Sequence, residues 1–298
     1  MKQANNTELN KIGFIGVGRM GYGICLNLLA RGYRLNYLAH SGNQDCQDLD
    51  RQGAIAHDDA NLLARQCQVI MICVNTSTQV NAIISAPSGL IESLVPGQFI
   101  INLSTIDPDN SRALAASLQQ KSCIYIDAPM TRTPREAKSG RLNVLVGGDI
   151  KDIEKIRPVL EAFCENICHT GPTGTGHAMK LLHNHVSLGF ITLLCETVAT
   201  ARRQNIDVAQ LLHVLESGGG ASTALDRLKP YLREGNDTAM QFSIANTIKD
   251  LDYYRLMAES CGVDSAVSGL LRLLNNRGDA VLERPIPHLV DLLTPADK

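Results

Sequence analysis

The feature that most constrains the fold of this chain is a short apolar segment that runs directly into a glycine-rich turn. Residues 11–17 read KIGFIGV, and the turn Gly16-Val-Gly-Arg-Met-Gly21 overlaps their end. Apolar residues then recur every four positions over 20–28, and Gly32 stands where a helix would stop. This order of strand, glycine turn and helix is the context in which G-x-G-x-x-G binds a dinucleotide. The alternative is a glycine-rich turn without a ligand.

Each glycine of this turn has a physical role in dinucleotide binding. The first permits the tight turn, the second lets the backbone approach a pyrophosphate, and the third allows the helix to pack closely on the strand. The helix N-terminus adds N–H donors and the positive end of its dipole. The predicted cofactor contacts in this segment are Gly16, Gly18, Arg19, Met20 and Gly21.

The segment after the second predicted strand, residues 33–39, bears on the choice of cofactor. An NAD site would place a carboxylate there to accept a hydrogen bond from the ribose 2′-OH. The first acid is Asp45, so a 2′-phosphate would meet no repulsion, and His40, Ser41 and Asn43 could donate to one. The sequence therefore favours NADP(H) over NAD(H). The alternative is that these are ordinary turn residues and either cofactor binds.

Two apolar runs suit buried parallel strands, at residues 69–74 (VIMICV) and 99–103 (FIINL). Small polar residues follow each run, at 75–78 and at 104–105. Ligands of doubly wound sheets bind beyond the carboxyl ends of the strands, so these residues could contact cofactor or substrate, or could simply cap helices. The pattern predicts an α/β fold class with a Rossmann-type, mostly parallel sheet.

A further predicted strand ends in Asp127-Ala-Pro129 and opens into the loop Thr131-Arg132-Thr133. This loop would lie at the rim of the crevice, with one fixed positive charge between two hydroxyls. The planar fork of Arg132 suits a carboxylate, a sulfonate or a phosphate. The alternative is an ordinary surface arginine.

From residue 175 onward the strand pattern does not return, and helical periodicity predicts an all-α second domain. Four polar residues at positions i, i+3, i+4 and i+7 share one side of its first, apolar helix, which makes them either its solvated face or the wall of a site. These residues are Lys180, His183, Asn184 and Ser187. The predicted organisation is a polar N-terminal tail (1–10), a dinucleotide-binding domain (11–170) and an all-α domain (171–298) with a long helix from about residue 175.

Composition excludes several classes of protein. The net charge of −2 argues against a general nucleic-acid or membrane-surface binder. Apolar runs fall short of the roughly 20 residues of a membrane span. The polar start lacks the apolar core of a signal peptide, so we expect a cytoplasmic protein. The nine cysteines include no C-x-x-C pair, which predicts free thiols and no metal site.

Four signatures in this order resemble the β-hydroxyacid dehydrogenase family, which includes 3-hydroxyisobutyrate dehydrogenase and several semialdehyde reductases. The resemblance covers about residues 11 to 290. The signatures are the glycine turn 16–21 followed by Asn27, Asp127-Ala-Pro-Met with Gly140 downstream, Gly174-x-Gly176-x-x-x-Lys180-x-x-x-Asn184, and Lys249-Asp250-Leu251.

The resemblance implies hydride transfer between a nicotinamide and a short anionic aldehyde or hydroxyacid, in a homodimer or homotetramer. It implies that Lys180 is the catalytic residue and that Asn184 contacts the substrate. It also implies cofactor contacts from Val74, Asn75, Thr105 and Lys249. Rival interpretations are a non-catalytic NADP(H) sensor and an imine reductase, although imine reductases usually replace the lysine.

The chain departs from the usual family pattern at the substrate loop. Most members have Ser-Gly-Gly where this chain has Thr131-Arg132-Thr133, and a Gly-Arg-Thr loop resembles the sulfolactaldehyde reductase branch, which commonly has asparagine at the position of His183. The loop implies a substrate with a strong anion. The predicted substrate-binding residues are Thr131, Arg132, Thr133, His183, Asn184 and Ser187.

Overall fold

The computed structural model describes residues 9–87, 89–275 and 281–294. The chain divides into two compact units, one ending at Lys180 and the other beginning at Leu181. Most of the predicted N-terminal tail, residues 1–8, lies outside the described residues. The division falls inside a long helix, whereas the sequence placed its domain boundary at residues 170–171.

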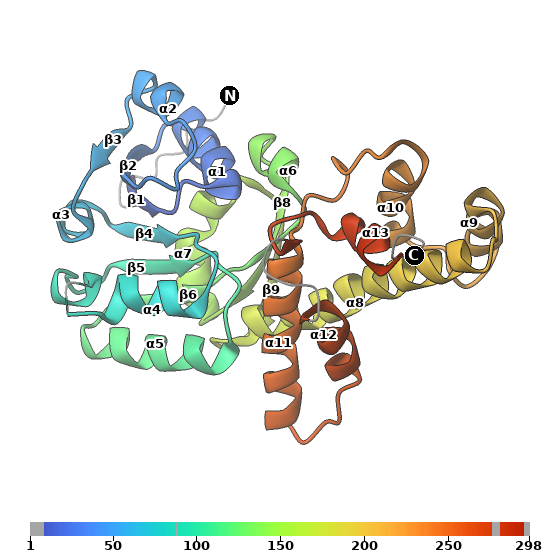
Figure 1. The fold of residues 1–298 in the computed structure, drawn as a ribbon. Coiled ribbons are helices and arrows are strands. Elements are labelled where there is room, and N and C mark those ends of the chain that lie inside the picture. The colour runs from blue at the N-terminus through green and yellow to red at the C-terminus, as the bar shows by residue number, and fades with distance from the viewer. Residues whose placement is uncertain (1–8, 88, 276–280, 295–298) are drawn as a thin grey trace. The chain divides into compact units, whose positions relative to one another are not determined.

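The first unit is built on a mostly parallel sheet with the strand order β3-β2-β1-β4-β5-β6-β8-β7, and β9 pairs with β8 (Figure 1). Strands β1 to β6 run parallel, and β8 is antiparallel to β6 and β7. The predicted Rossmann-type fold class is confirmed. The strands are β1 (Lys11–Ile15), β2 (Arg34–Leu38), β3 (Ile55–His57), β4 (Val69–Ile72), β5 (Phe99–Asn102), β6 (Ile124–Asp127), β7 (Met130–Thr131), β8 (Leu142–Gly147) and β9 (Cys164–Gly171).

Both faces of this sheet are buried against apolar cores. Successive strand residues point to opposite faces, so each strand contributes to both cores. In β4, Val69 and Met71 join the core on one face, and Ile70 and Ile72 join the core on the other. Helices α1, α6 and α7 cover the first face, and α3, α4 and α5 cover the second. The helices are α1 (Arg19–Ala30), α2 (Gln47–Arg51), α3 (Ala60–Gln66), α4 (Ser77–Ser85), α5 (Pro108–Gln120), α6 (Pro134–Lys138) and α7 (Ile150–Leu160), with a 3-10 turn η1 (Leu90–Glu92).

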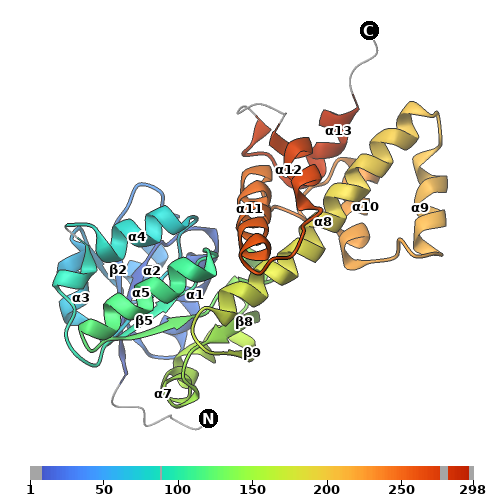
Figure 2. The same ribbon diagram turned by 90° about the horizontal axis from the view of Figure 1, so that it is seen from below.

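The second unit is helical throughout its described part, apart from an isolated bridge between Ser243 and Pro285. Figure 2 shows its shorter helices gathered around the later part of α8, where one apolar core joins them. The sequence pattern predicts a final helix over residues 264–277; it corresponds to α12, which begins at Val267, and residues 276–277 lie outside the described residues. The elements are α8 (Thr175–Arg203), α9 (Val208–Glu216), α10 (Thr223–Glu234), α11 (Ile244–Ser260), α12 (Val267–Asn275), η3 (Ile286–His288) and α13 (Leu289–Leu293).

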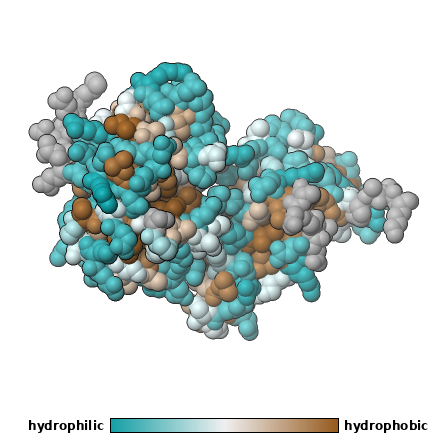
Figure 3. Space-filling model, turned by 60° about the vertical axis from the view of Figure 1, so that its left-hand side comes forward, coloured by the Kyte–Doolittle hydropathy of each residue, from teal (hydrophilic) through white to brown (hydrophobic). Residues whose placement is uncertain are grey.

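All nine cysteines are free thiols, as the sequence predicted. Among the described residues, no helix combines the length and apolarity needed to cross a membrane. On the face drawn in Figure 3, apolar side chains form separate patches within a largely polar surface.

We expect acid to destabilise the second unit through His185. Its ring stacks on Tyr254 at 3.8 Å between centroids and 4° between planes, and burial lowers the pKa of the imidazole. The unfolded chain therefore takes up a proton more readily than the folded one, so stability falls as the pH drops through the ordinary histidine value of about 6.5. Urea midpoints at pH 8 and 5.5 should differ less in His185→Phe than in wild type. An equal difference in both proteins would contradict this role.

Candidate active site

The glycine turn after β1 has the geometry of a dinucleotide-binding turn. Gly16 adopts φ +96°, and a Cβ there would lie 2.1 Å from the carbonyl oxygen of Cys73. A Cβ on Gly21 would lie 2.2 Å from the carbonyl oxygen of Gly16, so α1 packs directly on the turn. At Gly18 a Cβ would meet no described atom within 4 Å, and no described side chain caps α1 there. This uncapped helix N-terminus with open space before it fits a bound pyrophosphate.

The sheet register brings the other predicted cofactor loops of the first unit to the same edge. Strand β4 pairs with β1 and β5 pairs with β4, so the residues that follow these strands are neighbours. The backbone N–H of Val74 donates to the Ser104 hydroxyl at 3.0 Å, which ties the β4 loop to the segment before Thr105. Asn75 donates its backbone N–H to the Gln79 side chain at 2.9 Å. The predicted contact Lys249 lies in the second unit.

The loop after β2 leaves two of its polar side chains exposed. These are His40 and Ser41, although His40 Nδ1 accepts from the Gly42 N–H at 2.9 Å. Asn43, by contrast, holds the loop together, since its amide accepts from Val17 N and donates to Leu38 O. Asp45 caps the next turn by accepting from the Gln47 N–H at 3.0 Å.

The carboxylate of Asp127 holds the start of α8, a role that the sequence did not reveal. It is fully buried and accepts from Gly174 N at 2.8 Å and from His177 N at 3.1 Å. Gly174 has no side chain to cap the helix, so Asp127 supplies the acceptor that an N-cap residue would provide. A Cβ on Gly176 would lie 2.7 Å from this carboxylate, which explains the glycine there. The cap lets α8 begin at Thr175, where the sequence predicted the start of a long helix.

Lys180 lies in the second turn of α8 and is buried, with 8% of its surface exposed. Asn184, one turn further on, is 3% exposed. These two residues are therefore not part of a solvated face. The predicted polar stripe is split, because His183 is exposed and Ser187 is half-buried.

In the second unit, Asn184 is held by the Lys249-Asp250-Leu251 signature. Its amide nitrogen donates to the buried Asp250 carboxylate at 2.6 Å, and its oxygen lies 2.9 Å from Nδ1 of His183. The Lys249 ammonium lies 3.0 Å from the other carboxylate oxygen of Asp250. The signature thus links an ammonium to the Asn184 amide through one carboxylate.

The substrate loop is more engaged with its own unit than the sequence indicated. Arg132 has φ +79°, and its guanidinium pairs with Glu165 and donates to the carbonyl of Arg141. This contact holds the pKa of the Glu165 carboxyl below its usual range. Thr133 caps α6 and donates its hydroxyl to Glu136 at 2.5 Å. An incoming anion would have to share Arg132 with Glu165.

Thr131, the first residue of this loop, is also engaged. Its hydroxyl accepts from the amide of Asn143 on β8 at 3.2 Å. All three predicted substrate-binding side chains of the loop therefore have partners within the first unit. Glu165 and Asn143 were not singled out from the sequence, because nothing local marks a partner in another element. Glu136 was also missed, although the capping-box spacing Thr133-x-x-Glu136 is a local signal for it.

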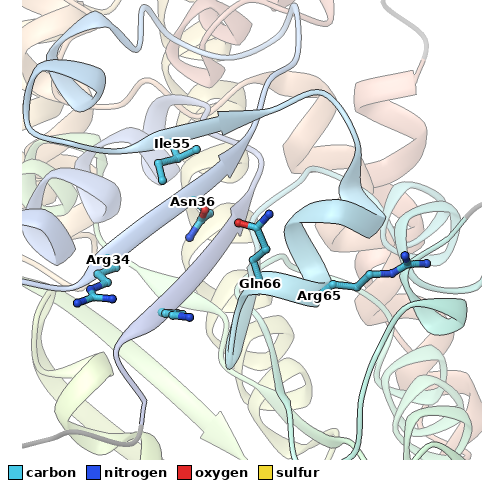
Figure 4. Close-up of a pocket in the computed structure, with 6 residues that line it drawn as sticks. Arg34, Asn36, Ile55, Arg65 and Gln66 are labelled. Atoms are coloured by element: carbon cyan, nitrogen blue, oxygen red, sulfur yellow. The ribbon is translucent and has the colours of Figure 1, made fainter.

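A pocket at the opposite edge of the sheet is separate from these residues. It lies at the amino ends of β1 and β2, away from the glycine turn at the carboxyl end of β1 (Figure 4). In this view the side chain of Arg65 points away from that of Arg34, so the cations do not converge on one point. Its lining residues are Lys11, Arg34, Asn36, Ile55, Arg65 and Gln66.

Comparisons with known proteins agree with this geometry. Residues 11–171 match the NAD binding domain of 6-phosphogluconate dehydrogenase, and residues 174–284 match the NAD-binding domain of NADP-dependent 3-hydroxyisobutyrate dehydrogenase. An uncharacterized oxidoreductase of Synechocystis is 31% identical over 85% of this chain and 87% of its own. The NAD-dependent L-serine dehydrogenase of Pseudomonas aeruginosa is 28% identical over 91% of this chain and 94% of its own. The solved structure of Psf3 in complex with NADP+ and 2-OPP is 28% identical in sequence, with a TM-score of 0.81. The match covers 95% of this chain and 99% of that chain.

Proposed function

The chain belongs to the β-hydroxyacid dehydrogenase family, and we propose that it transfers hydride between NADP(H) and a short anionic aldehyde or hydroxyacid, with Lys180 as general acid and base. As a member of this family it is an NAD(P)-dependent oxidoreductase that acts on a CH–OH group. The observation that carries the finer proposal is the burial of the Lys180 side chain in the unit that holds the dinucleotide turn. Lysine side chains are rarely buried in a fold, so the burial of Lys180 in this unit supports a functional role for it.

The proposed chemistry follows from the properties of the ammonium group. When bound, the nicotinamide supplies or accepts the hydride. In reduction, Lys180 donates a hydrogen bond to the carbonyl oxygen, stabilises the charge that develops there and delivers the proton. In oxidation, the neutral amine removes the hydroxyl proton. Asn184 lies on the same side of α8 at i+4, where we propose that it contacts the substrate.

The proposed preference for NADP(H) rests on the loop after β2. His40 and Ser41 are exposed beyond this strand, and Asp45, the first acid, is engaged in capping. A 2′-phosphate would therefore meet donors before it met a carboxylate. Assays with both reduced cofactors test this preference, and a lower KM for NADH than for NADPH would contradict it.

We propose that Arg132 binds the acid group of the substrate. Arg132→Asn should raise the KM for an anionic aldehyde about 10- to 100-fold with little change in kcat, because one charge-assisted hydrogen bond is worth roughly 1.5–3 kcal/mol. Asparagine tolerates the positive φ of this position, so the loop is not strained by the change. Steady-state kinetics with an anionic aldehyde and with a neutral one measure the effect. Arg157→Asn, on helix α7, is the control. If Arg132→Asn raised the KM for the neutral aldehyde as much as for the anionic one, Arg132 would not have this role.

We also propose a homodimer or homotetramer. Large apolar side chains remain exposed along one side of α8 at Met179, Leu182, Val186 and Leu193, and such stripes are typical of subunit interfaces. Light scattering coupled to gel filtration should report at least twice the monomer mass, and Leu182→Glu combined with Val186→Glu should reduce it. Val263→Glu, at another exposed apolar position, should leave the mass unchanged. A monomeric wild type would rule the proposal out.

One set of assays separates this function from its rivals. Oxidation of NADPH and NADH is followed with sulfolactaldehyde, succinic semialdehyde, tartronate semialdehyde, methylmalonate semialdehyde and glyoxylate, and reduction of NADP+ with L-serine. We expect turnover with at least one of these anions and none with cyclic imines. Cofactor binding without turnover across the panel would instead favour the non-catalytic sensor, and turnover of imines alone would favour an imine reductase.

A further inference from the structure

A buried histidine joins the helix of Lys180 to the edge of the sheet where the cofactor loops begin. His177 is fully buried in the first turn of α8. Its Nε2 lies 2.9 Å from the carbonyl oxygen of Ser104, and its Nδ1 lies 3.1 Å from the hydroxyl of Ser111. A carbonyl oxygen only accepts, so Nε2 carries a proton and donates it.

The partners of His177 are themselves tied into the sheet. The Ser111 hydroxyl, on α5, donates to Tyr125 on β6 at 3.1 Å, and Tyr125 accepts from the Asn102 amide at 3.0 Å. The Asn102 oxygen accepts from the backbone N–H of Ser104 at 3.0 Å. The chain of hydrogen bonds thus returns to Ser104, the residue that His177 contacts directly.

Ser104 is also the residue that organises the two neighbouring loops. Its hydroxyl accepts from Val74 N at 3.0 Å, and Thr105 follows it in the chain. Val74 and Thr105 are both predicted cofactor contacts. His177 is therefore one hydrogen bond away from the segment that would hold the cofactor.

Lys180 follows His177 by three positions in the same helix, so the two side chains leave α8 on the same side. The hydrogen bond between His177 and Ser104 holds the first turn of α8 against the segment that follows β5. We propose that His177 is a positioning residue that sets the distance between the Lys180 ammonium and the cofactor loops. This inference rests on the function proposed above and concerns how that site is assembled.

Two substitutions separate the two hydrogen bonds of the ring. Glutamine is long enough to place an amide nitrogen where Nε2 lies, and asparagine reaches only to the place of Nδ1. In His177→Asn we expect kcat to fall about 10- to 100-fold, the loss typical of a displacement near 1 Å, and the Kd of NADPH to rise several-fold. His177→Gln should retain most of both values. The exposed His213→Gln is the matched control.

Isotope effects and NMR distinguish positioning from simple stabilisation. With NADPH deuterated at C4, the kinetic isotope effect on kcat should rise in His177→Asn, because hydride transfer becomes slower than the other steps. A merely structural histidine would lower the melting temperature in both variants and leave the isotope effect and the Kd unchanged. Wild-type values of kcat, isotope effect and NADPH Kd in His177→Asn would overturn the proposal.

The inference is also testable if no aldehyde in the panel is reduced. The proton on Nε2 should then give a slowly exchanging imidazole N–H signal in the NMR spectrum of the full chain, absent from His177→Gln. NADPH titration should still separate His177→Asn from His177→Gln. Absence of that signal from wild type, or equal NADPH affinity in the two variants, would refute the positioning role even though the proposed reaction had already failed.

Discussion

Replacing Lys180 by alanine should lower kcat by about 10²- to 10⁴-fold, the range typical for loss of a general acid and base. Lys180 is buried and we assign its ammonium to the carbonyl oxygen, so its removal leaves the developing charge without a donor. The Kd of NADPH should stay close to the wild-type value, because the glycine turn and the loops after β4 and β5 are unchanged. Stopped-flow measurement of NADPH oxidation and fluorescence titration of the cofactor give the two quantities.

The arginine variant refines this test. Lys180→Arg keeps a positive charge but cannot release its proton near neutral pH, since arginine stays protonated. If proton transfer is the main contribution, Lys180→Arg should be nearly as slow as Lys180→Ala. Lys151→Ala, at an exposed position on α7, should match wild type. Near-normal turnover of Lys180→Ala would show that another group carries the reaction.

Replacing Asp127 by alanine should cost the first unit about 2–6 kcal/mol of unfolding free energy. Two buried backbone N–H groups, of Gly174 and His177, would lose their acceptor, and each unsatisfied donor costs about 1–3 kcal/mol. The carboxylate also lies at the N-terminus of a long helix, where its charge is favourable. Urea denaturation followed by circular dichroism should show the transition of the first unit at a lower midpoint.

A matched substitution shows what an ordinary helix cap contributes. Asp149 is exposed and caps α7 by accepting from the Lys151 N–H at 2.8 Å. Asp149→Ala should cost only about 1 kcal/mol, because water can replace the lost acceptor. Asp127→Asn keeps one acceptor oxygen, so its loss of unfolding free energy should lie between the losses in Asp127→Ala and Asp149→Ala. If Asp127→Ala costs no more than Asp149→Ala, the buried carboxylate does not hold α8 in the way described.

Residues of the second, third and fourth sequence signatures hydrogen-bond to one another in the structure, and residues of the first and second lie in contact. Asn27, from the first signature, donates to Ala137 O on α6, and a Cβ on Gly140 would lie 2.8 Å from its side-chain oxygen. Asp127 of the second signature holds the glycine-rich start of the third, and Asn184 of the third donates to Asp250 of the fourth. These signature residues therefore hold one another in place, and Lys180 is the residue to which we assign the chemistry.

The sequence located most elements because their signals are local. The run VIMICV contains strand β4, and the periodicity after residue 175 marks the helices of the second unit. It missed the short strand β3, which has little apolar pattern of its own. The sequence also suggested that the Arg132 guanidinium is available to an anion. In the structure this guanidinium pairs with Glu165, 33 residues further along the chain.

The sequence by itself determined the glycine turn, the two-sided burial of the sheet and the helical second unit, since spacing between neighbouring residues carries that information. Only the tertiary structure decided which buried polar groups meet. Asp127 caps α8 from 47 residues away, and His177 reaches Ser104 across 73. Such pairs depend on strand register and helix packing, and a buried donor or acceptor takes whichever partner the fold brings within 3 Å or so.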